Sequence, residues 1–336
     1  VIVAIIDTGI DRDHPDMAGR IWRNEREIPY NGFDDDHNGF VDDTVGWDFS
    51  GDTLAQQSFE DADPSDDVGH GSHVAGIAGA AIDDTIGMAG IVNDCLLMSL
   101  KFYPNLRYST AARAVAYAAD NGADVINMSW GGYFPGPILE EALTYASKKG
   151  VILCAASGND GTDKPHYPAF YPNVIAVGAT DSRDRVTDFS NYGNYIDVCA
   201  PGAAILSLRA DSTDIYAETG EPNVHIYNEQ YYIASGTSMS TPHVTGVAAY
   251  IRALAPGITP AEVRTLIRES ADDLTDPYGT GESHPGYDRF SGAGRVNLAR
   301  ALQALPAWGV HLVRPVPNEI VFGTVELYAT VVASEG

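Results

Sequence analysis

The chain has 336 residues, of which 44% are hydrophobic, so it holds enough apolar material for one large domain or two smaller ones. Aspartate and glutamate total 46 against 20 lysines and arginines, which gives a net charge of −26 at pH 7. A chain this acidic repels nucleic acids and anionic membranes, so we expect neither as a partner, whereas divalent cations suit it. It contains no run of about 18 apolar residues that would indicate a membrane-spanning helix.

Short, continuous runs of apolar and β-branched residues predict buried strands. The chain begins inside the first of these runs, residues 1–7, so we expect further residues upstream of it. Helical spacing of apolar residues predicts helices over 109–122 and 137–150. Alternating strands and helices predict an α/β fold with a mainly parallel central sheet, and sites at the carboxyl ends of its strands. The other predicted strands span 95–101, 123–129, 150–157 and 173–179.

The C-terminal third contains two further predicted helices and then changes character. Thr259 and Glu262 have the spacing of a capping box at the start of one helix, and the other spans 297–305. Residues 306–336 have strand composition, prolines and no helix signal. We therefore expect one large domain over 1–305, followed either by the start of a β-rich module or by a terminal hairpin packed on that domain.

Residues 31–43, NGFDDDHNGFVDD, have the residue order of a calcium-binding loop when Asp34 is counted as the first position. The twelfth position is Val45, where an EF-hand has a glutamate, so the sequence predicts a calcium loop outside an EF-hand. Asp43 is the candidate for the missing carboxylate, and a solvated acidic turn is the alternative. The predicted ligands are Asp34, Asp36, Asn38, the carbonyl of Phe40, Asp42 and Asp43.

Three polar residues follow a predicted strand or begin a predicted helix. Asp7 ends the first strand, His70 begins a helix rich in small residues, and Ser238 begins a long helix. Each is a weak signal alone, because a serine before a helix is usually a cap. Together they are the groups that acyl transfer to a serine requires: a nucleophile, a base and a carboxylate that orients the base.

The stretches that carry these residues, DTGID (7–11), HGSHVAG (70–76) and GTSMSTPHVTG (236–246), resemble the three catalytic signatures of the subtilisin-like serine proteases, or subtilases. The resemblance runs from residue 1 to about residue 305 and includes NMSWGG and AASGN. It implies the three-layer subtilisin-like fold and a secreted serine endopeptidase. In that family's pattern Ser238 is the nucleophile, His70 the base and Asp7 its orienting carboxylate. Asn159 and the N–H of Ser238 are the oxyanion donors, and His73 and His243 are structural.

The resemblance also implies where a peptide substrate binds. Residues 129–132 are expected to pair with it as an added strand, and the primary pocket to accept a medium or large apolar residue, with Asp160 adding tolerance for basic ones. Residues 102–108 are expected at the opposite edge of the groove. The segment 211–235 is expected either to rim the site or to form a solvated surface hairpin. The implied substrate-binding residues are Ser129, Trp130, Gly131, Gly132, Ala156, Ser157, Gly158 and His166.

Calcium and the partners follow from the same resemblance. A second calcium loop is implied within residues 81–90, inside the helix of His70, and a third, weaker site near Ala169, Tyr171, Val174 and Asp197. Expected partners are protein or peptide substrates and the enzyme's own removed propeptide, acting as an inhibitor. The alternatives are a specialised peptide-processing enzyme and a catalytically silent binding module on the same fold. The ligands implied for the second calcium site are Asp16, Asp84 and the carbonyls of Ile82, Ile86 and Met88.

Overall fold

The computed structural model describes residues 1–51, 60–211, 213–216, 226–274 and 285–305, together with the backbone of 309–314 and 328–332. No helix within these residues is long and apolar enough to cross a lipid bilayer. The helices of the described residues are α1 (His70–Gly79), α2 (Tyr108–Asp120), α3 (Pro137–Lys148), α4 (Thr237–Leu254), α5 (Pro260–Glu269), α6 (Leu298–Ala304) and a 3₁₀ turn at Pro15–Met17.

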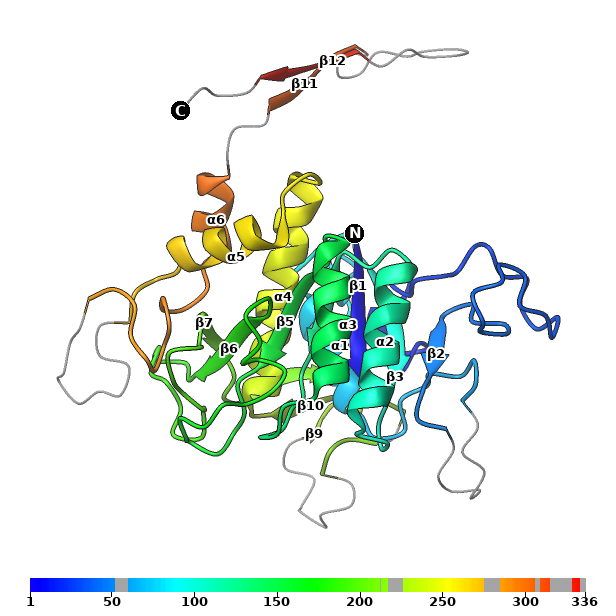
Figure 1. The fold of residues 1–336 in the computed structure, drawn as a ribbon, viewed down its shortest axis with the longest axis horizontal. Helices are drawn as coiled ribbons and strands as arrows, with labels where there is room; N and C mark the ends of the chain where they lie inside the picture. The colour runs from blue at the N-terminus through cyan, green and yellow to red at the C-terminus, as the bar shows by residue number, and fades with distance from the viewer. Residues whose placement is uncertain are drawn as a thin grey trace.

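A seven-stranded sheet forms the centre of the molecule, and its strands follow the order β2-β3-β1-β4-β5-β6-β7. All neighbouring strands are parallel, so their carboxyl ends meet at one edge. The chain passes from β3 across β1 to β4, which places the end of β1 near the middle of that edge (Figure 1). The strands are β1 (Ile2–Asp7), β2 (Gly46–Asp48), β3 (Leu96–Lys101), β4 (Val125–Met128), β5 (Ile152–Ala156), β6 (Ile175–Thr180) and β7 (Val198–Pro201).

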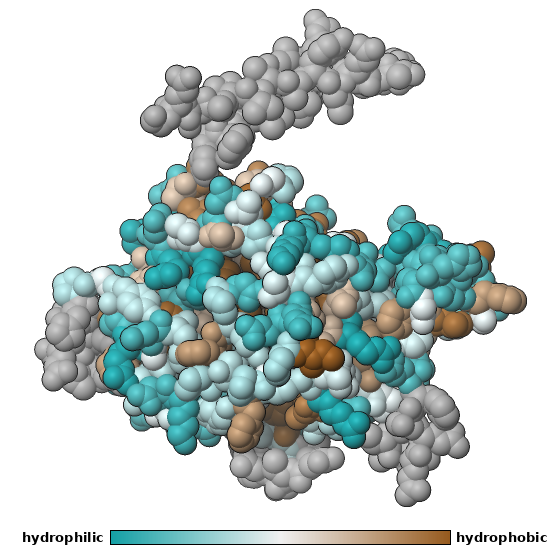
Figure 2. Space-filling model, viewed as in Figure 1, coloured by the Kyte–Doolittle hydropathy of each residue, from teal (hydrophilic) through white to brown (hydrophobic). Residues whose placement is uncertain are grey.

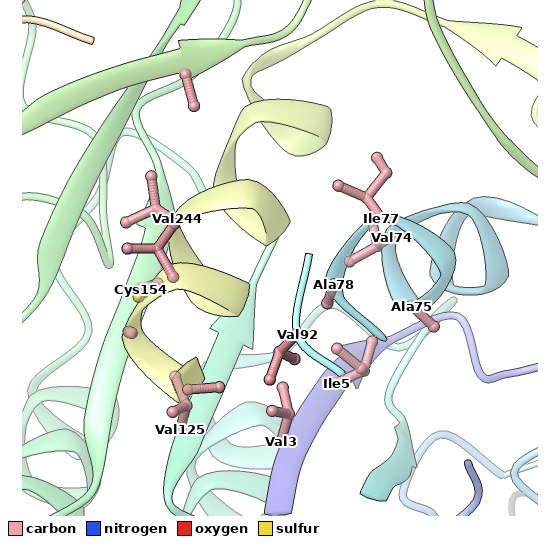
Figure 3. Close-up of a cluster of buried hydrophobic side chains, with 14 of the residues drawn as sticks. Val3, Ile5, Val74, Ala75, Ile77, Ala78, Val92, Val125, Cys154 and Val244 are labelled. Atoms are coloured by element: carbon pink, nitrogen blue, oxygen red, sulfur yellow. The ribbon is translucent and has the colours of Figure 1, made fainter. Parts of the chain in front are cut away.

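Helices cover both faces of this sheet. Alternate residues of a strand point to opposite faces. Val3 and Ile5 of β1 therefore pack with α1 and α4, whereas Ala4 and Ile6 pack on the side of α2 and α3. Figure 3 shows the first of these clusters, where Val3 and Ile5 lie close to α1 and α4. Burial on both faces explains why the strands are continuously apolar in sequence.

The predicted elements of the central domain are confirmed, with ends displaced by no more than two residues. Three helix starts also match the sequence. His70 is the first residue of α1, and Ser238 lies in the first turn of α4. Thr259 accepts a hydrogen bond from the N–H of Glu262, whose carboxylate accepts one from the N–H of Thr259, as the capping box predicts.

Two smaller sheets complete the described strands. β8 (Ile205–Leu208), β10 (Tyr231–Ala234) and β9 (Ile226–Tyr227) form an antiparallel sheet in that order. β11 (Gly309–Arg314) and β12 (Tyr328–Val332) pair with each other. The rest of 306–336 lies outside the described residues, so the choice between a β-rich module and a terminal hairpin stays a prediction.

Candidate active site and cation sites

Asp7 and His70 meet at the carboxyl edge of the sheet. The Asp7 side chain is 3% exposed, and its Oδ1 lies 2.7 Å from His70 Nδ1. A carboxylate only accepts, so Nδ1 carries the proton and Nε2 is left as an acceptor. Burial opposes protonation of His70, but the charge of Asp7, the hydrogen bond to Asp7 and the charge of Asp66 together outweigh it and raise the pKa of His70 above 6.5. The contact is possible because Gly71, next to His70, packs directly on the backbone of Gly9, where no side chain would fit.

A proline inside α4 explains how Ser238 is held. Pro242 has no N–H, so the carbonyl of Ser238, four residues earlier, lacks its helical partner. The hydroxyl of Ser129, just past β4, donates to that carbonyl at 2.8 Å. In return the Ser238 hydroxyl donates to the Ser129 carbonyl at 2.9 Å. The structure thus brings Ser238 to Ser129, and among the described residues no hydrogen bond joins Ser238 to His70.

Asn159 lies beside the start of α4, as predicted. Its Oδ1 accepts hydrogen bonds from the N–H and the hydroxyl of Thr237, at 2.8 and 2.9 Å. Because the amide is planar, these bonds turn Nδ2 away from Thr237. A Cβ placed on Gly236 would lie 3.3 Å from Asn159 Nδ2 and 3.7 Å from the N of Ser238. Asn159 Nδ2 and the backbone nitrogen of Ser238 therefore lie near one point at the start of α4.

The two other histidines of the signatures make structural contacts, in agreement with the sequence. His73 is completely buried, and its Nε2 lies 3.1 Å from the carbonyl of Ile205 and 3.2 Å from that of Tyr232. It thereby ties α1 to the β8–β10 sheet. Burial and the neighbouring His70 lower the pKa of His73 to about 3. His243 bonds to the carbonyl of Met239 one turn earlier in α4.

A cleft of about 440 Å³ opens beside Asp7 and His70. One wall comes from residues 102–106, as predicted for that edge of the groove. The opposite wall includes Thr213–Ile215, which resolves the alternative for this part of the 211–235 segment: it rims the site. Residues 217–225 lie outside the described residues. The side chains that line the cleft include Phe102, Tyr103, Leu106, Trp130, Thr213, Asp214 and Ile215.

The predicted substrate-binding segments lie on either side of Ser238, but several of their hydrogen-bonding groups are already bonded to other parts of the protein. Gly132 exchanges both of its backbone hydrogen bonds with Tyr167, at 2.7 and 2.8 Å, so it is not open to a peptide. The indole of Trp130 donates to the carbonyl of Ile6 at 2.7 Å. His166 is 7% exposed, and its Nδ1 lies 3.1 Å from the carbonyl of Ala156.

Comparison with known proteins decides the family. The model of the subtilase family (Peptidase_S8) matches residues 1–294. The chain is a subtilase.

This subtilase is 34% identical over 304 residues to thermitase from Thermoactinomyces vulgaris, which covers 90% of this chain and 88% of thermitase. It is 37% identical to a thermophilic serine proteinase from Bacillus sp. (strain AK1), over 89% of this chain and 61% of that one. The crystal structure of fervidolysin from Fervidobacterium pennivorans, described as a keratinolytic enzyme related to subtilisin, is 32% identical with a TM-score of 0.71; the match covers 93% of this chain and 44% of fervidolysin. The chain is therefore a subtilisin-like serine peptidase, with the fold that the sequence predicts.

The acidic loop of this subtilase projects beside β2 as a largely hydrophilic lobe (Figures 1 and 2). Carboxylate oxygens of Asp34, Asp36 and Glu27 lie within 4.8 Å of one another, which fits a cation that prefers oxygen ligands. Glu27 was not predicted, because it precedes the loop motif and nothing in the sequence distinguishes it from Glu25. Arg26 lies at the edge of the cluster, 3.1 Å from Asp36.

The remaining predicted ligands of this loop brace its fold. Both oxygens of Asp42 accept backbone N–H groups, from Asn31 and Gly32. Asn38 donates to Asp43, which is completely buried and also accepts hydrogen bonds from Asn24 and Tyr117. Asn24 also donates to Asp36, so Asp43 lies next to the cluster through a shared donor, and its role as the missing ligand stays a prediction. The ring of Phe40 packs on Trp47, Phe49 and Tyr117, which anchors the loop to α2 and β2.

The residues predicted for a second cation site include Asp16 and the loop that contacts it. This carboxylate is completely buried; its Oδ2 accepts from the N–H of Met88 and from the hydroxyl of Tyr231, but its Oδ1 has no hydrogen-bond partner. A buried carboxylate oxygen without a donor fits a bound cation. The loop of Ile82, Asp84 and Ile86 follows α1 and brings Met88 to Asp16. After the loop, the N–H groups of residues 91 and 92 donate to the carbonyls of residues 77 and 78 in α1. The chain therefore leaves the last turn of α1 and returns to it, as expected.

At the third predicted site, the Asp197 carboxylate is already paired within the protein. Asp197 is 1% exposed, and its Oδ1 accepts a hydrogen bond from Nε of Arg264 at 2.8 Å. The same guanidinium donates to the carbonyl of Pro172. Arg268 lies 3.6 Å from the same carboxylate oxygen. Guanidinium groups therefore already neutralise the Asp197 carboxylate, which makes it a poor metal ligand, and the expected site near Ala169, Tyr171 and Val174 stays a prediction.

Proposed function

We propose that this subtilase is an endopeptidase that hydrolyses peptide bonds through Asp7, His70 and Ser238. The observation that carries the proposal is the hydrogen bond from His70 to buried Asp7, because it leaves Nε2 of His70 as an acceptor for a serine proton. In this role Asp7 fixes the orientation of the imidazole and stabilises its charged form. The position of Ser238 in the first turn of α4 supports its role as nucleophile.

The reaction has two halves. The Ser238 hydroxyl exchanges its hydrogen bond to Ser129 for one to His70 and attacks the peptide carbonyl as His70 takes its proton. Asn159 Nδ2 and the N–H of Ser238 then donate to the oxyanion, and His70 returns the proton to the leaving amine. Water then attacks the acyl carbon as His70 takes its proton, the bond from that carbon to Ser238 Oγ breaks, and His70 returns the proton to Oγ. The expected advantage of the two preset donors is that they need no reorientation when charge develops.

The substrate lies as an added strand along residues 129–131, since Gly132 is paired with Tyr167. Ser157 and Gly158 face this segment from the other side of Ser238, and the cleft beside His70 takes the side chains that precede the cleaved residue. An extended peptide is the substrate class that such a groove suits. The enzyme's own removed propeptide, bound in the same groove, is the proposed inhibitor.

Calcium is the proposed stabilising ion, and the enzyme is proposed to be secreted. Glu27, Asp34 and Asp36 would hold one ion, and Asp16 with the 82–88 loop a second. The ion supplies charge neutralisation and cross-links a surface loop; it takes no part in the cleavage. Secretion is supported by the likeness of these loops to those of extracellular subtilases and by the millimolar calcium that sites of this kind meet outside cells.

Two experiments test the function. A fluorophosphonate probe should label the calcium-loaded protein at Ser238, and a Ser238→Ala variant should fold with the same melting temperature but take no label. If the folded wild type is not labelled, the chain is a binding module and the proposal fails. A random peptide library then measures breadth: cleavage of many members supports a general endopeptidase, and cleavage of almost none indicates a specialised processing enzyme.

A further inference from the structure

Two backbone segments enclose the space next to Ser238. On one side Ser129 holds Ser238 through the reciprocal hydrogen bonds, and residues 130–132 run on from it. On the other side Asn159 holds Thr237, and residues 156–158 lead into it. If Ser238 is the nucleophile, as proposed above, the residue before the cleaved bond places its side chain between these two segments. What fills this space therefore decides which residues are cleaved.

The imidazole of His166 lies in this space. A Cβ placed on Gly131 would lie 2.4 Å from Cε1 of His166, and one placed on Gly158 would lie 3.0 Å from its Cδ2. The ring thus spans from one segment to the other. Nδ1 lies 3.1 Å from the Ala156 carbonyl and must donate to it, which leaves Nε2 unprotonated. Nε2 is bonded to both Cε1 and Cδ2, so it faces the gap between the two glycines.

Tyr133 also helps to close the space between the two segments. It follows Gly132, and its hydroxyl donates to Asp160, the residue after Asn159. The bond therefore connects the far ends of the two segments. Asn191 donates to the same hydroxyl at 3.1 Å and accepts from the N–H of Asp160 at 3.0 Å, which fixes both partners. The Tyr133 ring packs edge-on against His166, with 5.3 Å between the ring centroids.

We propose that His166 and Tyr133 are specificity-determining residues that shorten the primary pocket, so that this subtilase cleaves after small residues, alanine and serine, in preference to aromatic or long ones. An aromatic side chain would have to displace a buried ring that packs on both segments and break the Tyr133–Asp160 bond. The expectation from the sequence, a pocket for a medium or large apolar residue, requires space that the imidazole occupies. The free Nε2 gives serine a hydrogen-bond acceptor that alanine does not use.

The test uses chromogenic tetrapeptides Ala-Ala-Ala-Xaa in which Xaa is Ala, Ser, Leu or Phe, with kcat/KM as the readout. For the wild type we expect alanine and serine to exceed phenylalanine by about 10-fold or more, the discrimination that a misfit of this size produces. In His166→Gly the phenylalanine substrate should gain about 10-fold or more relative to alanine. Tyr133→Phe keeps the ring and removes the bond to Asp160, and should give a smaller gain in the same direction.

Tyr145→Phe is the matched control, because Tyr145 also donates to an aspartate, Asp120, but far from the site on α3; its profile should equal the wild type. A wild type that prefers phenylalanine overturns the proposal, even if His166→Gly does not fold. So does a folded His166→Gly with an unchanged ratio of phenylalanine to alanine cleavage. Failure of the proposed function looks different: no substrate is cleaved and Ser238 takes no fluorophosphonate label.

Discussion

The His73→Gln variant should be less stable than its parent at neutral pH and at least as stable as its parent at acidic pH. His73 is completely buried, and its pKa is lowered from 6.5 to about 3. The unfolded chain therefore binds a proton on this histidine first as the pH falls. The stability that neutral His73 contributes is fully present above pH 6.5 and is lost between pH 6.5 and 3.

The size of the effect follows from that shift. Each unit of pKa difference corresponds to about 1.4 kcal/mol, so His73 removes on the order of 2 kcal/mol from the free energy of unfolding between pH 6.5 and pH 4.5. Glutamine keeps an N–H near the carbonyls of Ile205 and Tyr232 but does not titrate. At pH 7 we expect the variant to be about 1–2 kcal/mol less stable than the parent, because the replacement packs less well. At pH 4.5 the variant should equal or exceed the parent.

Urea unfolding at pH 7, 6, 5 and 4.5 measures this, with Ser238→Ala in both proteins to prevent self-digestion and with saturating calcium. Other groups titrate in this range as well, so the quantity to compare is the difference between parent and variant at each pH. A difference that stays constant from pH 7 to 4.5 would refute the reasoning, since it would mean that His73 titrates alike in the folded and unfolded chains.

Asn159→Ala should lower kcat by about 100- to 1000-fold with little change in KM, the loss measured for the corresponding donor of subtilisin, and an unchanged kcat removes Asn159 from the oxyanion site. The acid limb of the kcat/KM profile should lie above pH 6.5, because the charge of Asp7 raises the pKa of His70 and protonation abolishes its function as a base; a limb below 6.5 contradicts this. In Gly71→Ala the new methyl group would lie 2.1 Å from the carbonyl oxygen of Gly9, so the melting temperature should fall by several degrees and kcat/KM with it; wild-type values for both would show that the backbone contact is dispensable. Chelation should lower the melting temperature and speed self-digestion, since calcium at 100 times its Kd contributes about 2.7 kcal/mol, and Asp36→Ala should reproduce part of both; indifference to a chelator ends the calcium proposal.

The sequence was sufficient for the helices, for five of the seven strands of the central sheet and for the signatures, because these are written in short segments; β2 and β7, of three and four residues, were not predicted. A run such as residues 1–7 fixes a buried strand by its composition alone, and the parallel sheet then brings the strand ends together. Asp7 and His70 could be paired in advance because each sits at an element end with glycine neighbours. Pro242 was also visible, but its consequence, a free Ser238 carbonyl bound by Ser129, requires knowing which strand end lies beside α4.

The contacts that could not be predicted join residues far apart in the chain. Glu27 joins the acidic loop only because the chain turns back over it, and no local pattern marks it. The separation of the ends of β4 and β5 determines whether Tyr133 reaches Asp160. It also determines whether His166 fits between Gly131 and Gly158. That separation is set by packing across the whole sheet, which residue spacing does not encode.

The pair of Arg264 and Asp197 gives one part of this enzyme a fixed charge balance. A guanidinium on helix α5 is tethered by its own backbone, so it can be neither chelated nor diluted away, and it stays protonated at any pH the fold survives. The acidic loop and the Asp16 loop would instead depend on the ion content of the medium. When the medium is depleted of ions, the side of the molecule that bears β1, β2 and α1 should therefore loosen first, while the region of β6, β7 and α5 remains closed. Damage in a calcium-poor environment would begin at one end of the sheet and spread toward the other.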